Sequence, residues 1–212
     1  MKKLLSKIDG SAIQKVMKDI LILKKDVEKI GHKVSPDIAG FYGELLAWVQ
    51  LRNVFEKKGY AVKFGSGQSK ADIVLHKGVK RINIEVKTSR LKEEWFGIGY
   101  GFAINIKRCG EHPGRMLLHP KRGRVHGDFC YFNYLLAVLL SDDLRKARFY
   151  VFPRKLLEKN EVSLRNRNKR FSSSTHRIIF LEKPRRTDEI TRFDRLFLKS
   201  KKKFENAWSL IS

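Results

Sequence analysis

The 212-residue chain carries 46 Lys and Arg against 22 Asp and Glu, which gives a formal net charge of +24 at pH 7. A hydrophobic fraction of 42%, with 14 Phe, 6 Tyr and 3 Trp, is enough for a folded core and excludes wholesale disorder. No apolar run approaches the roughly 20 residues of a membrane-spanning helix, and Cys109 and Cys130 lack the spacing of a zinc knuckle. We therefore expect a soluble, cytoplasmic protein with no membrane association and no small-molecule cofactor.

The positive charge is concentrated in clusters that lie among aromatic and aliphatic residues, at 121–124, 165–170, 183–186 and 199–203. A folded surface that presents charge in this way is typical of proteins that bind the phosphate backbone of nucleic acids. On charge alone, RNA, acidic lipid and a general role in solubility remain open. We predict nucleic-acid contacts for Lys121, Arg122, Arg124, Arg165, Arg167, Lys169 and Arg170.

The first predicted helix spans residues 11–30, with Ser11 as its N-cap and Gly31 just beyond its end. Its apolar residues recur in steps of three and four, as in a heptad pattern. This stripe either packs on the body of the domain or serves as a dimerisation arm, and the sequence leaves both open. The members of the stripe are Ile13, Val16, Ile20, Leu23, Val27 and Ile30.

The second predicted helix opens at residues 35–37 (Ser-Pro-Asp) and runs to about Lys58. A capping hydroxyl, a proline at the first helical position and a carboxylate near the positive end of the helix dipole favour this start. Glu44 interrupts the apolar stripe of this helix, between Phe41 and Trp48. Because a buried and unpaired charge is costly, Glu44 needs a partner or a metal.

The rest of the chain is interpreted as strands and loops. The apolar segments within 128–140 and at 147–152 are typical of strands covered on both faces. Residues 91–108 are ambiguous, residues 111–127 are interpreted as a basic, histidine-containing loop, and a last helix begins at Thr187 or Asp188. Together these elements indicate an α/β fold with a central mixed sheet flanked by helices. The other predicted strands are 60–64, 71–76, 81–88 and 176–181.

The strands 71–76 and 81–88 form a hairpin whose two faces differ in chemistry. Side chains alternate along a strand, so the aliphatic residues of both strands point to one side. With a connection over residues 77–80, His76 pairs with Arg81 and Asp72 falls opposite Glu85, and a register shift of two residues changes no face. The other side of the hairpin then carries Asp72, Glu85 and Lys87 close together.

Two carboxylates this close repel each other unless a cation lies between them, and Lys87 supplies only part of that compensation. Carboxylates, a main-chain carbonyl and waters are typical ligands of Mg²⁺ at phosphates. We therefore predict a metal site at Asp72, Glu85 and the backbone carbonyl of Val86, for Mg²⁺ with Mn²⁺ as a substitute. Such a metal activates a phosphate and a water, and Lys87 orients that water or helps to deprotonate it.

These residues, with Glu44 on the upstream helix, resemble the PD-(D/E)XK nuclease superfamily. The matching pattern is Asp72 followed in the next strand by the Glu-x-Lys of Glu85 and Lys87, within residues 41–87. The resemblance implies a restriction-endonuclease-like fold in which Asp72 and Glu85 bind the metal and Lys87 assists the attacking water. It also implies that Glu44 completes the acidic site, directly or through water.

The surroundings of this motif separate it from a chance match. A second Glu-x-Lys, at Glu56 and Lys58, lies at a helix end, whereas Glu85 and Lys87 lie in an alternating strand opposite Asp72. The alternative is a surface hairpin whose charges form a solvated ion-pair cluster, which would contribute little to stability. The residue before Asp72 is alanine, where the motif has a proline.

The resemblance implies a metal-dependent DNA endonuclease, and restriction-type cleavage of duplex DNA by a homodimer is the leading expectation, because cutting both strands needs two sites. Residues 165–168 (Arg-Asn-Arg-Asn) then read base edges or hold phosphates. Residues 65–72 are similar to the Gly/Ser-rich approach to the catalytic Asp of archaeal Holliday-junction resolvases, which implies a structure-specific repair nuclease as an alternative. An RNA-processing nuclease and a non-catalytic nucleic-acid-binding protein with a nuclease-like fold also remain open.

We expect three parts in the chain: an N-terminal helical arm at 1–34, a nuclease core at 35–152 and a basic C-terminal region at 153–212. The last part either belongs to the same domain or forms a small DNA-binding extension. The histidines of the basic loop are interpreted as loop or phosphate-contacting residues, with a metal trio as the alternative. These are His112, His119 and His126.

Overall fold

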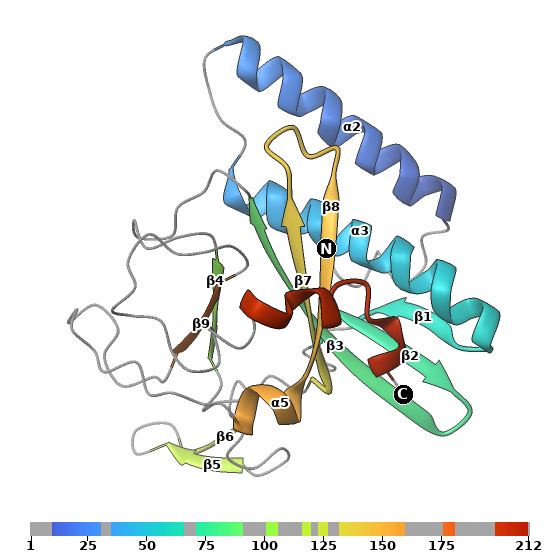
Figure 1. Cartoon of the computed structure of the whole chain (residues 1–212), viewed down its shortest axis with the longest axis vertical. Coiled ribbons are helices and arrows are strands. Elements are labelled where there is room, and N and C mark those ends of the chain that lie inside the picture. Colours follow the sequence, from blue (N-terminus) through green and yellow to red (C-terminus); the bar gives the residue numbers. More distant parts are fainter. Residues whose placement is uncertain are drawn as a thin grey trace.

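A mixed five-stranded sheet with the strand order β1-β2-β3-β7-β8 lies at the centre of the molecule (Figure 1). The β3–β7 pairing is parallel, and the other three pairings are antiparallel. The α/β class and the mixed sheet predicted from the sequence are therefore confirmed. The strands are β1 (Ala61–Phe64), β2 (Ile73–Lys77), β3 (Lys80–Arg90), β7 (Tyr134–Leu140) and β8 (Ala147–Pro153).

This computed structural model describes residues 10–30, 35–65, 71–90, 101–105, 116–119, 123–126, 132–159, 176–180 and 198–211. Within these ranges α2 and α3 lie on one side of the main sheet, and a second, two-stranded sheet of β4 and β9 lies on the other (Figure 1). The helices are α2 (Gly10–Lys29), α3 (Pro36–Phe55) and α5 (Arg154–Lys159), with short 3-10 helices η1 (Glu56–Lys58), η2 (Lys201–Lys203) and η3 (Trp208–Leu210). The remaining strands are β4 (Gly101–Asn105), β5 (Met116–His119), β6 (Gly123–His126) and β9 (His176–Phe180).

The start of α3 agrees with its sequence signals. The Ser35 Oγ accepts a hydrogen bond from the Ile38 N–H at 3.3 Å, and Pro36 opens the helix. The α-helix ends at Phe55, the chain continues as η1, and Gly59 stops it with a φ of +78°. A left-handed residue of this kind favours glycine, so the chain can turn here into β1.

Replacing Ser35 with Ala is expected to lower the free energy of unfolding by about 1 kcal/mol, because the Ile38 N–H loses its acceptor. Chemical denaturation of both proteins measures the difference. Ser35→Asn is the matched control, since its side-chain oxygen can accept the same bond and should retain most of the stability. Equal stability of the Ala and Asn variants would show that the cap contributes nothing.

The backbone of α3 approaches β3 closely. A Cβ built on Gly43 would lie 2.9 Å from the Thr88 Cβ and 2.8 Å from its Cγ2, closer than packed carbon atoms approach. The Thr88 Oγ1 also donates a hydrogen bond to the Gly40 carbonyl at 3.5 Å. Glycine at position 43 therefore sets the distance between the helix and the strand.

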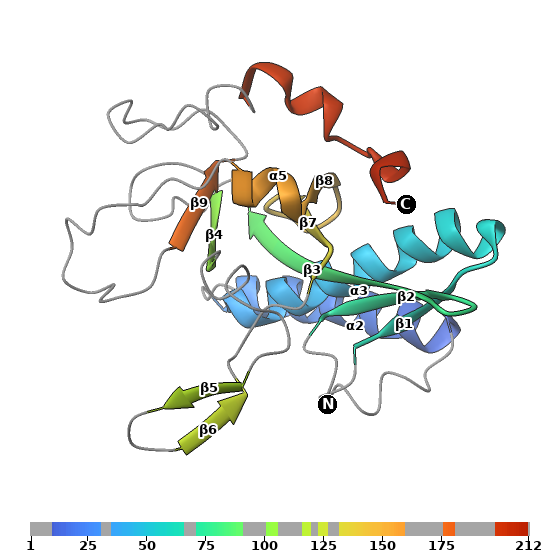
Figure 2. The same ribbon diagram turned by 90° about the horizontal axis from the view of Figure 1, so that it is seen from below.

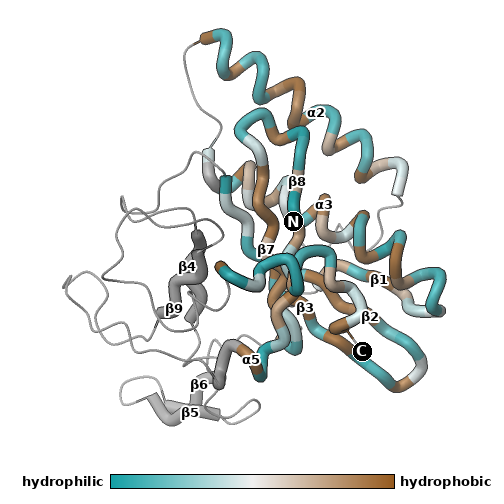
Figure 3. The backbone as a smooth tube through the Cα atoms, viewed as in Figure 1, coloured by the Kyte–Doolittle hydropathy of each residue, from teal (hydrophilic) through white to brown (hydrophobic). Residues whose placement is uncertain are grey.

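The heptad stripe predicted for α2 is only partly buried. Ile13 and Ile20 are buried in the core, but Leu23 is 45% exposed and Ile30 is 71% exposed. Lys24, and not Leu23, takes the buried position in the second half of the helix. Hydrophobic and hydrophilic residues alternate along α2 in Figure 3, which is consistent with one face on the body of the domain. The predicted stripe is thus wrong at Leu23 and Ile30, whereas Val27 is partly buried.

Lys24 is tolerated there because its ammonium group pairs with Glu28, one turn along the helix. Its aliphatic stem can cover apolar surface while the charged end reaches the carboxylate. Residues 10–29 therefore pack on the body of the domain, which is one of the two interpretations given above; the other was a dimerisation arm.

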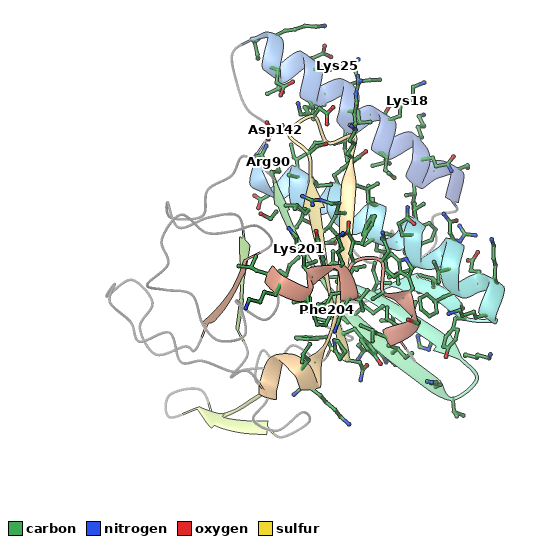
Figure 4. The ribbon with its side chains drawn as sticks, in the orientation of Figure 1. Lys18, Lys25, Arg90, Asp142, Lys201 and Phe204 are labelled. Carbon is green, nitrogen blue, oxygen red and sulfur yellow. The ribbon has the colours of Figure 1, made fainter. Side chains whose placement is uncertain are left out.

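The outer edge of β8 is covered by residues 204–206. The Val151 N–H donates to the Phe204 carbonyl, and the Asn206 N–H donates to the Phe149 carbonyl, both at 2.9 Å. Figure 4 shows Phe204 in front of the strands, where its ring lies 5.2 Å from that of Phe152. An edge strand whose backbone groups are already bonded offers no template for pairing with other chains.

Two segments differ from their sequence interpretations. Residues 116–126, assigned to a basic loop, contain the antiparallel hairpin of β5 and β6, which lies apart from the main sheet (Figure 2). Its strands are only four residues long, and the apolar residues Leu117 and Leu118 are adjacent and do not alternate with polar ones, so the alternation signal is weak. In the ambiguous stretch 91–108 the structure has β4, which pairs with β9 far along the chain.

The start of the predicted last helix lies outside the described residues. Among the helices that are described, none is long and apolar enough to span a membrane.

Candidate active site

The β2–β3 hairpin has one of the two registers that the sequence left open, the one expected for a connection over residues 77–80, but its turn is shorter than that connection. His76 pairs with Arg81, and Lys77 with Lys80, which leaves two residues in the turn. Gly78 has a φ of +56° at the first of these positions, the sign of φ that a type II′ turn requires. Because the last pair of the ladder is Ile73 with Ile84, the next residues on each strand, Asp72 and Glu85, stand opposite one another.

The two faces of the hairpin separate as the alternation predicts. Ile73 and Ile84 are fully buried in the core, together with Leu75, Ile82 and Val86. Thr88, on the same side of β3, meets Gly43, so this side faces α3. Glu85 and Lys87 therefore project from the opposite side of the strand.

Asp72 and Glu85 are both only 8% exposed, which is unusual for ionisable residues and requires specific partners. The Asp72 Oδ2 accepts a hydrogen bond from the Val86 N–H at 2.9 Å. The Glu85 Oε1 forms an ion pair with the Lys87 Nζ. The lysine side chain is 34% exposed, so the ammonium group links a buried carboxylate to the surface of the site.

The two carboxylates lie where β3 stops pairing with β2 on one edge and begins to pair with β7 on its other edge. The ladder with β2 ends at Ile84, and the parallel ladder with β7 begins at the same residue and continues to Arg90. The Asp72 side chain bonds to the β3 backbone just past the last β2 pair. This hydrogen bond fixes the carboxylate at the point where β2 and β3 separate.

The residues at this point suit a divalent cation in their chemistry. Two adjacent carboxylates, with waters and phosphate oxygens, form the kind of ligand set in which Mg²⁺ is held at phosphates. In the part of the chain that the structure describes, no group of three or more His, Cys, Asp or Glu side chains is arranged to hold a metal ion. The fit therefore depends on Asp72 and Glu85, completed by oxygen ligands that are not side chains.

Glu44 lies on α3 next to Gly43 and is partly buried. It does not join Asp72 and Glu85 in a three-carboxylate group. A contact of Glu44 with the site through water stays a prediction, as does coordination by the Val86 carbonyl.

Most of the predicted nucleic-acid contacts lie outside the described residues. Arg124 is the exception: it lies in β6, where it pairs with Leu118. His119 and His126 lie at opposite ends of this hairpin, roughly 10 Å apart along the ladder, which does not favour a shared metal. The residues outside the described ranges are Lys121, Arg122, Arg165, Arg167, Lys169 and Arg170.

The sequence interpretation overlooked charged residues on the carboxylate side of the hairpin. The observed register puts Arg81 on the side of β3 that carries Asn83 and Glu85, and it puts His76 of β2 and Lys63 of β1 on the same side of the sheet. The alternation of side chains along β3 could have predicted the position of Arg81, because Arg81 lies an even number of residues from Glu85 and therefore points to the same side. Lys63 required the pairing of β1, which the sequence alone does not fix.

Comparisons with known proteins give similarity to solved structures. No protein-family model matches the chain, and no curated protein matches it. The structure of the bacterial homing endonuclease I-Ssp6803I is similar over 84% of this chain and 93% of that chain, with 21% sequence identity and a TM-score of 0.40. Because the sequence identity and the TM-score are low, the function proposed below depends on the geometry of the site.

Proposed function

We propose that this protein is a metal-dependent DNA endonuclease of the PD-(D/E)XK type, which hydrolyses phosphodiester bonds. The observation that supports the proposal most is the buried pair of Asp72 and Glu85, adjacent across the hairpin, with Lys87 bonded to Glu85. A structural ion pair would need only one carboxylate for one lysine. The second buried carboxylate, on a chain with a net charge of +24, favours a site for a cation and a polyanion.

In this proposal Asp72, Glu85 and the Val86 carbonyl hold Mg²⁺ or Mn²⁺, with Glu44 acting through water. The chemistry that such a cation supplies is Lewis-acid activation of the scissile phosphate and of the attacking water. The hydrogen bond from the Val86 N–H holds the Asp72 carboxylate in one orientation, so little reorganisation is needed when the ligands assemble.

Lys87 would act on the water and on the phosphate. Its Nζ is held beside Glu85, and the partial exposure of its side chain allows a substrate phosphate to approach it. An ammonium group in this position can orient the water and donate hydrogen bonds to the phosphate oxygens as negative charge develops on them. The water oxygen would bond to phosphorus while one of its protons passes to solvent, and the bond to the leaving oxygen of the DNA strand would break, with a proton from solvent completing the new hydroxyl group.

Duplex DNA is the proposed substrate, cut in a restriction-type reaction by a homodimer. The positive charge supports binding of the phosphate backbone, and two copies of the site are needed to cut both strands. Cleavage confined to branched DNA would instead indicate a structure-specific repair nuclease.

Removing the metal should abolish the activity. Purified protein is incubated with supercoiled plasmid, with a synthetic four-way junction and with single-stranded RNA, in Mg²⁺, in Mn²⁺ and in EDTA. We expect nicked or linear plasmid in either metal and intact plasmid in EDTA, because two carboxylates and a lysine alone do not activate a phosphodiester. Cleavage that persists in EDTA would contradict the metal dependence, and a protein that cuts none of the substrates would contradict the proposed function.

A further inference from the structure

We propose that the outer part of the β1–β3 meander is a docking surface for the phosphate backbone of a nucleic acid, on the same side of the sheet as the carboxylate pair. This surface, called the hairpin face below, consists of Lys63, His76, Arg81 and Asn83. That the bound polymer is a substrate depends on the proposed function, but its binding can be measured without cleavage.

Strand register places these side chains together. His76 pairs with Arg81 across β2 and β3, and Lys63 and Asn83 both pair with Val74, one from each neighbouring strand. Directly paired residues in a sheet point to the same side. Asp72 and Glu85 occupy the same side of their strands, because each lies an even number of residues from these positions.

The opposite side of the same strands is apolar and occupied. Val62 and Phe64 of β1 are buried in the core, and the Phe64 ring stacks on Trp48 of α3 at 5.5 Å. The meander therefore cannot turn its charged side inward, and Lys63 and Arg81 are exposed.

The charges of the hairpin face lie close to one another. The pKa of His76 is lowered, first by partial burial and then by the positive charges of Arg81 and Lys63. Among the described residues, Lys63 and Arg81 form no ion pair, whereas Lys29 and Arg52 each pair with a carboxylate three or four residues away in the chain. Adjacent cations that repel each other are stabilised by an anion between them.

Arg81 is held in position for such an anion. Its Nε donates to the Asn83 Oδ1 at 3.0 Å, and the Asn83 N–H donates to the Asn133 Oδ1 at 2.8 Å. A guanidinium group that is fixed through Nε still presents donors on its other nitrogens, in the fork that matches phosphate oxygens.

The spacing fits a nucleic-acid strand. Arg81 and Glu85 are four residues apart on β3, which is about 14 Å along a strand. Phosphates follow one another at short, regular intervals along a nucleic-acid backbone, so a strand bound at the carboxylates can continue past the hairpin face. A polymer with evenly spaced charges suits this arrangement better than an acidic peptide, whose carboxylates have no fixed spacing.

The test compares two variants of equal charge. Lys63→Ser with Arg81→Ser removes two cations from the hairpin face, and Lys18→Ser with Lys25→Ser removes two exposed cations from α2. Figure 4 shows that Lys18 and Lys25 point away from the sheet. Binding to a short fluorescent duplex is measured by anisotropy in EDTA, over a series of salt concentrations. Thermal unfolding of each variant checks that the fold is retained.

We expect the hairpin-face variant to bind at least about tenfold more weakly near 0.1 M salt, and its log–log salt slope to fall by about 1.8, for two lost phosphate contacts. The α2 variant should stay within about threefold of the wild type, because long-range charge effects are screened over about 10 Å. Equal losses in both variants would mean that only total charge matters, and would overturn the proposal. Unchanged binding by the hairpin-face variant, or a wild type that binds no duplex, would also overturn it.

A second probe distinguishes a nucleic acid from an acidic protein as the molecule that binds the hairpin face. Cleavage then distinguishes this inference from the proposed endonuclease function. Poly-glutamate replaces the duplex in the same assay, and loss of its binding alone in the hairpin-face variant would assign the surface to an acidic protein and overturn our inference. If the wild type cuts a duplex, a single neutral methylphosphonate is placed at successive positions on either side of the cut, and at one of these positions it should weaken wild-type binding more than binding by the hairpin-face variant. A wild type that binds through this surface but cuts nothing would contradict the proposed function and support this inference.

Discussion

Replacing Glu85 with Gln is expected to reduce DNA cleavage at least about 10³-fold, a loss of about 4 kcal/mol of transition-state stabilisation. The amide keeps the size of the side chain but removes one of the two negative charges proposed to hold the metal, and the ion pair with Lys87. Cleavage is measured in single-turnover reactions with saturating protein. Binding to DNA in EDTA should not weaken, because the change removes a negative charge facing a polyanion.

The chain contains a matched control for this prediction. Glu56 belongs to a second Glu-x-Lys, pairs with the Arg52 Nε at 2.6 Å and lies in η1, away from β3. Glu56→Gln removes the same charge from the same kind of local sequence and should leave cleavage within about twofold of the wild type, as is usual for exposed helical ion pairs. Similar activity of the two variants would remove Glu85 from the catalytic site, and with it the basis of the proposed mechanism.

The largest expected effect on stability is that of Gly43→Ala, which should lower the free energy of unfolding by about 2–3 kcal/mol. The added methyl group would meet the Cβ and Cγ2 of Thr88 at 2.9 and 2.8 Å, with its Oγ1 nearer still. Relief requires α3 and β3 to move apart. For a protein of this length such a loss corresponds to a melting temperature lower by roughly 5–10 °C, measurable by calorimetry.

Gly40→Ala, one turn earlier in the same helix, is the control. No atom lies within 4 Å of a Cβ at that position, so alanine should stabilise the helix by up to about 1 kcal/mol. Thr88→Ala should reduce the cost of Gly43→Ala, since two of the three close contacts disappear. If the two glycine variants are equally stable, the close approach of α3 to β3 is wrong. Cleavage should fall in Gly43→Ala as well, because Thr88 directly follows Lys87.

The candidate site was predictable because its geometry is local. Alternation assigned Asp72 and Glu85 to one side of a hairpin, and a short connection limited the register to choices that leave every face unchanged. The sequence did not contain the role of the Val86 N–H, since a hydrogen bond from a backbone group to an aspartate depends on where β2 ends.

Features that depend on distant contacts were not predictable in the same way. The pairing of β4 with β9 joins segments with no local signal for each other. On α2, the choice between Leu23 and Lys24 for the buried position depends on the surface that the helix meets, and the pattern of the helix alone favoured leucine. Glu44 illustrates the same limit, because its place in an apolar stripe indicated a partner but not which one.

The first half of β3 pairs with β2 and its second half pairs with β7, so these two parts of the sheet can form at different stages of folding. The hairpin with β2 closes through a two-residue turn and can appear on the order of microseconds, whereas the ladder with β7 must first bring together segments separated by the whole stretch from Arg90 to Tyr134. Folding should therefore be limited by the recruitment of β7, and substitutions there should slow folding more than substitutions in the turn. The acidic pair would thus be assembled early, before the strand that completes its surroundings arrives.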